Sequence, residues 1–155
     1  MVNVLLYAPE YRPNLSNMIR SAEFFGLKHI YIFDKNGLLD PPKNKATKAD
    51  MEHLARVWTA GAVEHIEIRK IDDVRSFFKS YPGRKIATVI DERAQHLDQF
   101  TFQENDLIIM GPEKEGLSYS TRALCNEKVF LPNKGVTDCL NVSVMLGIML
   151  FASLK

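Results

Sequence analysis

Residues 128–144, KVFLPNKGVTDCLNVSV, run from a short β-forming segment through a polar loop into the start of an apolar helix. Valine and phenylalanine favour strands, which places a strand at residues 128–131. Gly135 lies in the loop, and Asn141 stands where the helix starts. The succession of strand, loop and helix recurs along the chain, and it is the unit from which α/β sheets are built.

Six segments are short runs rich in β-forming residues. They are residues 2–7, 29–33, 64–68, 85–90, 106–110 and 128–131. Between them, residues 14–25 have the period of a helix that ends at Gly26, a second stripe contains Met51, Leu54, Ala55 and Trp58, and a third contains Val74, Phe77 and Phe78. Because parallel strands need helical crossovers, this alternation predicts an α/β fold with a mostly parallel six-stranded sheet flanked by helices.

The last predicted helix, residues 141–154, is apolar on nearly every side. A helix of this kind has to be buried, and at the end of a small domain another subunit buries it most easily. This pattern favours a homodimer. The apolar stretch of residues 142–152 is far below the roughly 20 residues that span a bilayer, so no membrane insertion is expected.

The chain has 155 residues, 46% of them hydrophobic, which is enough for one core and too few for two. We therefore expect a single domain over residues 1–155 with no accessory domain. The 20 basic and 19 acidic residues give a net charge of +1, so charge alone does not indicate a polyanionic partner. The N-terminus does not resemble a signal peptide, so we expect a cytoplasmic location. In that reducing compartment Cys125 and Cys139 are expected as free thiols.

The common motifs of α/β enzymes are absent from the sequence. It contains no Gly-x-Gly-x-x-Gly, no Gly-x4-Gly-Lys, no His-Glu-x-x-His, no Gly-x-Ser-x-Gly and no Cys-x-x-Cys. The four histidines are scattered without ligand-like spacing, so no metal is predicted. Asp91 follows a predicted strand, and we interpret it as part of a solvated loop.

Three polar segments stand out, each beginning just beyond a predicted strand, where ligands gather in open α/β sheets. Residues 13–20, PNLSNMIR, open a helix, and residues 110–118, MGPEKEGLS, run from a strand into a glycine-bearing loop where backbone amides can approach a ligand closely. Residues 131–144 form the third segment. Taken singly, their residues fit ordinary roles as helix caps, turn formers and surface cations.

Together and in order, these segments resemble the three signature motifs of SpoU-type methyltransferases of the SPOUT superfamily, over essentially the whole chain. The resemblance implies an α/β domain whose C-terminal third is threaded into a trefoil knot, and a homodimer whose active sites are each completed across the subunit interface. It also implies S-adenosylmethionine as cofactor and methylation of a ribose 2′-hydroxyl in RNA.

The resemblance assigns four catalytic residues, Arg20, Asn14, Glu113 and Asn141. Arg20 matches the arginine with the central role. Because a guanidinium stays protonated, we expect it to stabilise a developing alkoxide rather than to act as a base. Glu113 and Asn141 would brace the loops and this arginine.

Four further residues are implied as cofactor contacts, largely through their backbone: Thr88, Gly111, Leu131 and Leu140. Three residues depart from the usual motifs, since Ser16 replaces a glycine, Pro112 an asparagine and Cys139 a serine. The short chain favours tRNA over ribosomal RNA as substrate, because compact family members often act on tRNA. The basic residues of the chain that could contact RNA phosphates are Arg12, Lys43, Lys45, Lys48, Lys114 and Lys134.

Two alternatives remain open at this point. The first is a non-catalytic RNA-binding or cofactor-binding relative of the family, which turnover would separate from an enzyme. The second is an unrelated α/β nucleotide or phosphate enzyme, against which the missing glycine motifs argue.

Overall fold

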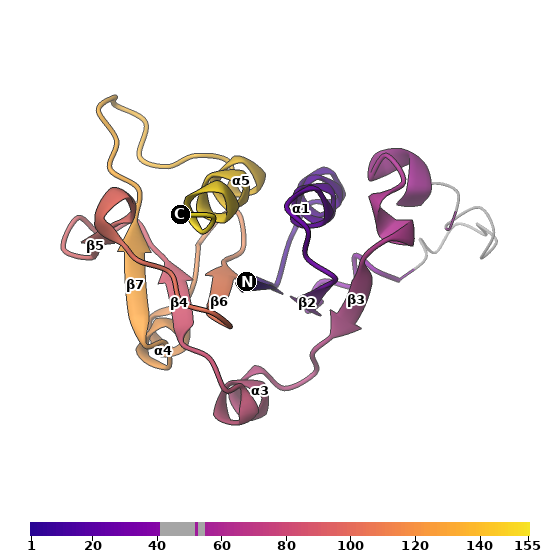
Figure 1. The fold of residues 1–155 in the computed structure, drawn as a ribbon, viewed down its shortest axis with the longest axis horizontal. Coiled ribbons are helices and arrows are strands. Elements are labelled where there is room, and N and C mark those ends of the chain that lie inside the picture. Colours follow the sequence, from indigo (N-terminus) through magenta and orange to yellow (C-terminus); the bar gives the residue numbers. More distant parts are fainter. Residues whose placement is uncertain (41–51, 53–54) are drawn as a thin grey trace.

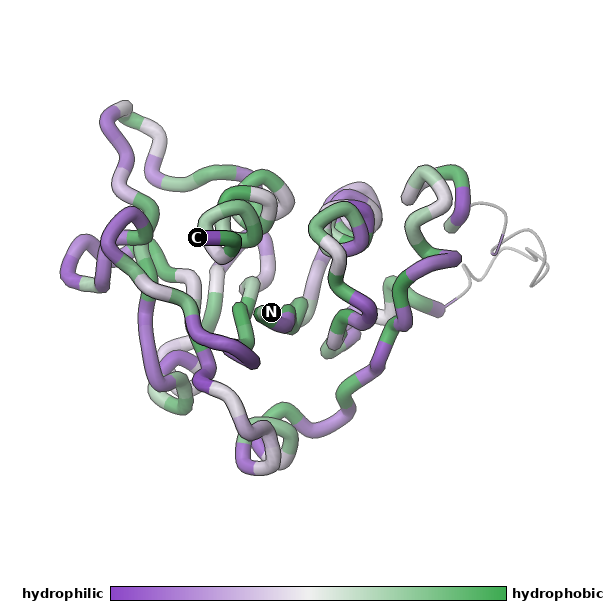
Figure 2. Tube along the Cα trace, in the orientation of Figure 1, coloured by the Kyte–Doolittle hydropathy of each residue, from purple (hydrophilic) through white to green (hydrophobic). Residues whose placement is uncertain are grey.

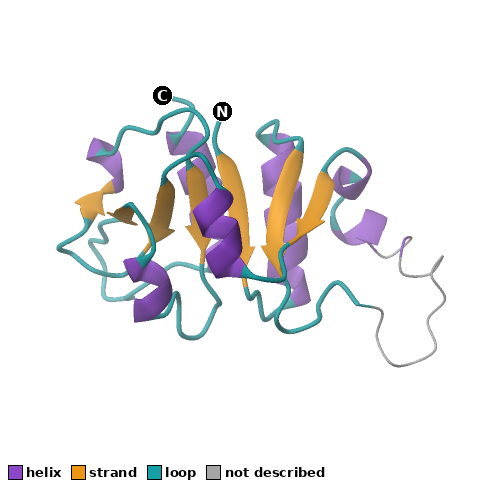
Figure 3. Cartoon of the chain, turned by 90° about the horizontal axis from the view of Figure 1, so that it is seen from below, coloured by secondary structure: helices purple, strands orange, loops and turns teal. Residues whose placement is uncertain are grey.

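The computed structural model describes residues 1–40, 52 and 55–155. Its sheet has the order β3-β2-β1-β6-β4-β7-β5, and the recorded strand pairings are all parallel. The strands are β1 (Asn3–Tyr7), β2 (His29–Phe33), β3 (Glu67–Lys70), β4 (Lys85–Thr88), β5 (Gln95–His96), β6 (Leu107–Met110) and β7 (Glu127–Phe130). In Figure 3 the strands lie side by side between two layers of helices. The predicted α/β class with a parallel sheet is confirmed, but the described sheet has seven strands where six were predicted.

The helices are α1 (Arg12–Phe24), α3 (Val74–Ser80), α4 (Tyr119–Ala123) and α5 (Val142–Ala152), with 3-10 turns η1 (Ala62–Glu64) and η2 (Leu97–Gln99). Figure 1 shows α1 and α5 neighbouring each other on one face of the sheet and α3 and α4 on the other. Residues 55–58 are also helical, whereas Met51 and Leu54 of the same predicted stripe lie outside the described residues.

The two helical layers cover two apolar faces of the central strands. Val4 and Leu6 of β1 belong to the core under α1 and α5, whereas Leu5 belongs to the core under α3. β6 alternates in the same way, and all four of its residues are buried. Figure 2 shows α5 as mostly hydrophobic. Side chains alternate across a strand, so a strand buried on both faces is apolar throughout, which is typical of a parallel sheet.

Some element boundaries differ from the predicted ones. The strand predicted at residues 64–68 is wrong by three residues, because Gly61, with a φ of 82°, leads into η1 and delays the strand to Glu67. The two-residue strand β5 was missed because it is too short for any alternation to show. α1 begins two residues before Asn14, since Pro13 in the first helical turn has no N–H that a helical bond would need.

The sheet has a topological switch at β1, which pairs with β2 on one side and with β6 on the other. In open parallel sheets, ligands bind beyond the carboxyl ends of the strands at such a switch. The loops at these ends are therefore the place to look for a site. The threading of the C-terminal third stays a prediction. No helix among the described residues is long and apolar enough to cross a membrane.

Candidate active site

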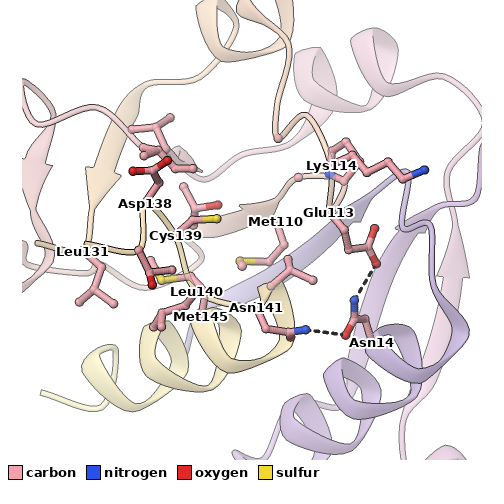
Figure 4. A pocket seen from close by; sticks show the side chains of 18 of the residues that line it. Asn14, Met110, Glu113, Lys114, Leu131, Asp138, Cys139, Leu140, Asn141 and Met145 are labelled. Carbon is pink, nitrogen blue, oxygen red and sulfur yellow. Dashed lines mark hydrogen bonds between the residues drawn. The ribbon is translucent and has the colours of Figure 1, made fainter. Parts of the chain in front are cut away.

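A cavity of about 930 Å³ lies beyond the carboxyl ends of β4, β6 and β7, near the upper end of the roughly 300–1,000 Å³ typical of ligand pockets. Four segments line it: Tyr11, Pro13 and Asn14; residues 88–90; residues 110–116; and a C-terminal group drawn from residues 130–145. Figure 4 shows Leu131 toward one end of the cavity and Asn14 and Glu113 toward the other. All three polar segments predicted from the sequence therefore meet at one cavity.

A chain of hydrogen bonds joins the three segments. Asn14 Nδ2 donates to Glu113 Oε1 at 3.2 Å, and Asn141 Nδ2 donates to Asn14 Oδ1 at 3.0 Å (Figure 4). Because Asn14 uses both ends of its amide, its orientation is fixed from both sides. Three of the predicted catalytic residues thus form one continuous polar contact along the cavity wall.

Asn141 also starts α5. Its Oδ1 accepts from the Ser143 backbone N–H at 2.8 Å and from the Ser143 hydroxyl at 2.6 Å. An asparagine at this position satisfies an N–H that the first turn of a helix leaves without a partner. The helix-capping role that the sequence suggests for Asn141 is therefore real, and the same side chain also contacts Asn14.

Glu113 and Glu10 connect the loop after β1 to the loop after β6. The Glu113 carboxylate accepts from the backbone N–H of Glu10 at 2.7 Å and of Tyr11 at 3.2 Å, while Glu10 Oε1 accepts from the Lys114 N–H at 3.0 Å. The two carboxylates thus bind each other's loops. Glu10 was missed from the sequence, although its place three residues beyond a predicted strand is a signal that could have found it.

Gly111 and Thr88 lie where the two central strands end. A Cβ on Gly111 would lie 2.7 Å from Leu117 N and 2.9 Å from Gly116 C, so only glycine fits there. The Thr88 hydroxyl donates to the Ile109 carbonyl at 3.0 Å, which ties β4 to β6. Both residues line the cavity, as Leu131 and Leu140 do.

Two methionines complete the apolar part of the wall. Met110 lies at the end of β6 and Met145 in the first half of α5, and both line the cavity in Figure 4. Neither was singled out in the sequence, because a buried methionine in a strand or helix gives the same apolar signal as any core residue. The cavity therefore offers apolar side chains and backbone groups along much of its length, with Asn14 and Glu113 at one end and Asp138 near Leu131 toward the other (Figure 4).

Arg20 is the one predicted site residue that does not line the cavity. It is exposed on α1, six residues after Asn14, which corresponds to about 9 Å along a helix axis. In the part of the chain that the structure describes, no hydrogen bond or ion pair of its guanidinium is recorded. The described chain alone thus does not bring Arg20 to the other three catalytic candidates.

The other titratable residues singled out in the sequence are Asp91 and the two cysteines. Asp91 accepts from Arg93 Nε at 3.1 Å and from the Arg93 N–H at 3.0 Å, hydrogen bonds that lower the pKa of its carboxyl, and it does not line the cavity. Burial raises the pKa of Cys125 to about 11, so this thiol stays protonated. Cys139 is exposed and lines the cavity. Both cysteines are free.

Among residues 1–40, 52 and 55–155, no group of three or more His, Cys, Asp or Glu side chains could hold a metal ion.

The predicted phosphate contacts are spread over the molecule. Lys114 lines the cavity and Lys134 is exposed in the loop after β7. Arg12 points elsewhere, since its guanidinium donates to the carbonyls of Leu38 and Asp40 at 3.4 Å each. The other three, Lys43, Lys45 and Lys48, lie outside the described residues.

Several known proteins resemble this chain. The 23S rRNA (guanosine-2'-O-)-methyltransferase RlmB of Acinetobacter baylyi is 27% identical over 144 residues, which cover 92% of this chain and 54% of that enzyme. A solved structure concerned with the 2-OH methylation of C/U34 on tRNA superposes with a TM-score of 0.82 at 25% identity, covering 99% of this chain and 94% of the other. An AdoMet-bound rRNA methyltransferase from Sinorhizobium meliloti has a TM-score of 0.77 at 22% identity, covering 99% and 55%.

The chain thus spans about half the length of the curated relative, whereas it spans nearly all of the tRNA-related structure. A model of the SpoU rRNA Methylase family matches residues 1–151, which include all the segments that line the cavity. On this match, the chain belongs to the SpoU rRNA Methylase family.

Proposed function

We propose that this protein transfers a methyl group from S-adenosylmethionine to a ribose 2′-hydroxyl in RNA. The observation that carries the proposal is the hydrogen-bonded chain from Glu113 through Asn14 to Asn141, which braces one end of a cavity whose remaining wall is largely apolar. Family membership supports the same reaction and argues against the alternative of an unrelated α/β nucleotide or phosphate enzyme.

The cavity wall fits S-adenosylmethionine in its chemistry. Gly111 leaves backbone close to the cavity, and Leu131, Leu140 and Met110 offer apolar surface that would exclude water around an adenosyl group. When bound, the cofactor supplies an electrophilic methyl group on a sulfonium. The related Sinorhizobium meliloti protein has been solved with AdoMet bound, which supports this choice of cofactor.

We assign to Arg20 the stabilisation of the developing ribose alkoxide, and we propose that it acts on the cavity of a second subunit. A guanidinium cannot serve as a base near neutral pH, but it lowers the energy of an oxyanion that it contacts. Its exposed position outside its own cavity supports an action across a dimer interface. In this arrangement Glu113, Asn14 and Asn141 hold the loops on which the ribose and cofactor rest.

The exposed side of α5 supports the homodimer. Val144 and Phe151, 52% and 63% exposed, are seven residues apart and so lie on the same side of the helix, which otherwise packs into the core with Leu146, Met149 and Leu150. Exposed apolar stripes of this kind mark interaction surfaces. A second copy of the chain would bury this stripe.

As substrate we favour tRNA over ribosomal RNA. The resemblance to the structure concerned with C/U34 of tRNA extends over 94% of that chain, whereas RlmB, which acts on 23S rRNA, is matched over 54% of its length. We further propose that residues 1–155 act as a single domain, and that the protein works in the cytoplasm.

A non-catalytic cofactor-binding relative is the second candidate, because Arg20 is not in the cavity of its own chain. The two are separated by incubating the protein with radiolabelled S-adenosylmethionine and unmodified tRNA or ribosomal RNA, and identifying the labelled nucleoside by mass spectrometry. The comparison includes Arg20→Ala and, as a matched control, Arg93→Ala, since Arg93 is an exposed arginine outside the cavity.

Methylation at a ribose 2′-oxygen, abolished in Arg20→Ala and kept in Arg93→Ala, with unchanged cofactor affinity in calorimetry, is the expected result. Cofactor binding without label on either RNA would favour the non-catalytic relative. Loss of cofactor binding in Arg20→Ala would mean that the residue is structural.

A further inference from the structure

The cavity is lined by more residues than those implied as contacts of the cofactor. Gly111, Leu131 and Leu140 belong to the loops after β6 and β7, whereas Tyr11, Pro13 and Asn14 come from the start of α1. Figure 4 shows Asn14 and Glu113 at the end of the cavity away from Leu131. This second end is available to the other reactant.

Tyr11 is held at that end by its backbone. Its N–H donates to Glu113 Oε1 at 3.2 Å, and its carbonyl accepts from the Leu15 N–H at 3.0 Å, so the start of α1 fixes its position. Its side chain makes no capping hydrogen bond, lines the cavity and is 48% exposed. As far as the described residues go, a half-exposed aromatic ring on a fixed backbone is thus available to a ligand.

The proposed reaction brings a nucleotide to this end of the cavity. Because a base is joined to its ribose, a nucleotide whose 2′-hydroxyl enters the cavity also brings its base to the cavity wall. Sequence-tolerant recognition of such bases uses aromatic side chains, because every base has a π-face. Lys114, an exposed cation that also lines the cavity, suits the adjacent phosphate.

We propose that the ring of Tyr11 stacks on the base of the target nucleotide. This inference rests on the proposed function, which supplies the ribose as the second reactant. It adds a binding subsite that the motif residues do not contain, since Tyr11 lies outside the three polar segments that point to the family.

The test measures binding and methylation separately. Dissociation constants for a pool of unmodified tRNA transcripts are measured by filter binding in the presence of S-adenosylhomocysteine at several salt concentrations. The variants are Tyr11→Ala, Tyr11→Phe and the control Tyr119→Ala, which removes a tyrosine that is 81% exposed and does not line the cavity.

Tyr11→Ala is expected to raise the dissociation constant roughly 5- to 150-fold, the effect of one lost base stack. The salt dependence should keep its slope, because no phosphate contact is removed. Tyr11→Phe retains the ring and should bind like the wild type, as should Tyr119→Ala. Unchanged cofactor affinity in calorimetry shows that Tyr11→Ala leaves the cavity intact.

Equal RNA binding by Tyr11→Ala and Tyr119→Ala overturns the inference, as does a wild-type protein that binds none of the transcripts. A wild-type protein that binds tRNA through Tyr11 but transfers no methyl group to it would instead count against the proposed function and leave the stacking subsite standing.

Discussion

Gly111 is the residue at which the cavity wall leaves no room for a side chain. The atoms that an added Cβ would meet, Leu117 N and Gly116 C, are backbone, so the loop cannot yield by a rotamer change. We expect Gly111→Ala to lower the free energy of unfolding by about 1–3 kcal/mol, the usual cost of overpacking, and to weaken cofactor binding. Urea denaturation and calorimetry with S-adenosylmethionine measure the two effects.

Gly135 provides the matched control, because it also lines the cavity but an added Cβ there meets nothing within 4 Å. Gly135→Ala should leave the free energy of unfolding and the cofactor affinity close to those of the wild type. Similar losses in both variants would mean that the close packing at Gly111 is not what shapes the wall.

The sequence identified the individual site residues better than the contacts between them. Asn14, Glu113 and Asn141 follow three different strands, and the rule that ligands gather at the carboxyl ends of strands predicts that they lie near one another. Their hydrogen bonds depend on side-chain orientation within about an ångström, which no residue pattern encodes. Arg20 is the exception among the predicted site residues. It lies on the same helix as Asn14, but Asn14 lines the cavity and Arg20 does not.

At the level of elements, the start of α5 is held by Asn141, which both caps the helix and donates to Asn14. Asn141→Asp keeps the oxygen that caps the Ser143 N–H, and a negative charge at a helix start is favourable, so stability should change by only a few tenths of a kcal/mol. The carboxylate cannot donate to Asn14 Oδ1. If Asn14 turns its amide around, it loses its bond to Glu113 instead. We therefore expect methyl transfer to fall while thermal unfolding stays nearly unchanged.

Asn141→Ala is the companion variant, which loses both the cap and the contact to Asn14. It should be destabilised by about 1 kcal/mol and also lose activity. Full activity of Asn141→Asp, measured with the same labelled cofactor, would show that the contact to Asn14 has no part in the reaction and that Asn141 serves only as a helix cap.

Element prediction succeeded where the apolar pattern was long and failed where a turn intervened. β2 has the predicted bounds, residues 29–33, because its alternation fills the whole strand. β3 was displaced by the turn after Gly61, whose positive φ is a property of the folded backbone. A partner that would cover the exposed stripe of α5 likewise cannot be identified from a single chain, although the apolar composition of α5 already indicated a buried helix.

For the whole molecule, the edge of the sheet opposite the cavity contains an ion pair whose carboxylate is buried and whose arginine is partly exposed. Asp106, with a side chain 1% exposed, accepts from Arg84 Nε at 2.9 Å and Nη2 at 2.7 Å, at the start of β6 and β4. Arg84→Ala would leave the buried Asp106 carboxylate without its cation. The cost should lie below the roughly 3–5 kcal/mol of a fully buried pair, because Arg84 is 26% exposed and the Gln103 N–H still donates to Asp106 at 2.8 Å. Urea denaturation should show this loss, whereas Arg93→Ala, which breaks an exposed pair, should change stability by less than about 1 kcal/mol.

The assembly of two chains decides whether Arg20 can reach a cavity at all. In a dimer of one Arg20→Ala chain and one Asn141→Asp chain, a site built within each chain is defective in both. A site shared between chains is intact once, because the Arg20→Ala chain supplies an unaltered cavity and its partner supplies Arg20. We therefore expect co-expressed, doubly tagged mixed dimers to regain methyl transfer that neither variant has alone.

Phe151→Asp, introduced into both chains, places a charge on the exposed stripe of α5 without touching any residue of the cavity. It should convert the dimer to a monomer in sedimentation and abolish the recovered activity, since burying a charged side chain in an apolar interface is costly. Mixed dimers that form but stay inactive would contradict a shared site. A chain that carries Phe151→Asp alone, is monomeric and still transfers methyl groups would place Arg20 and its cavity in one chain, which would require α1 to move.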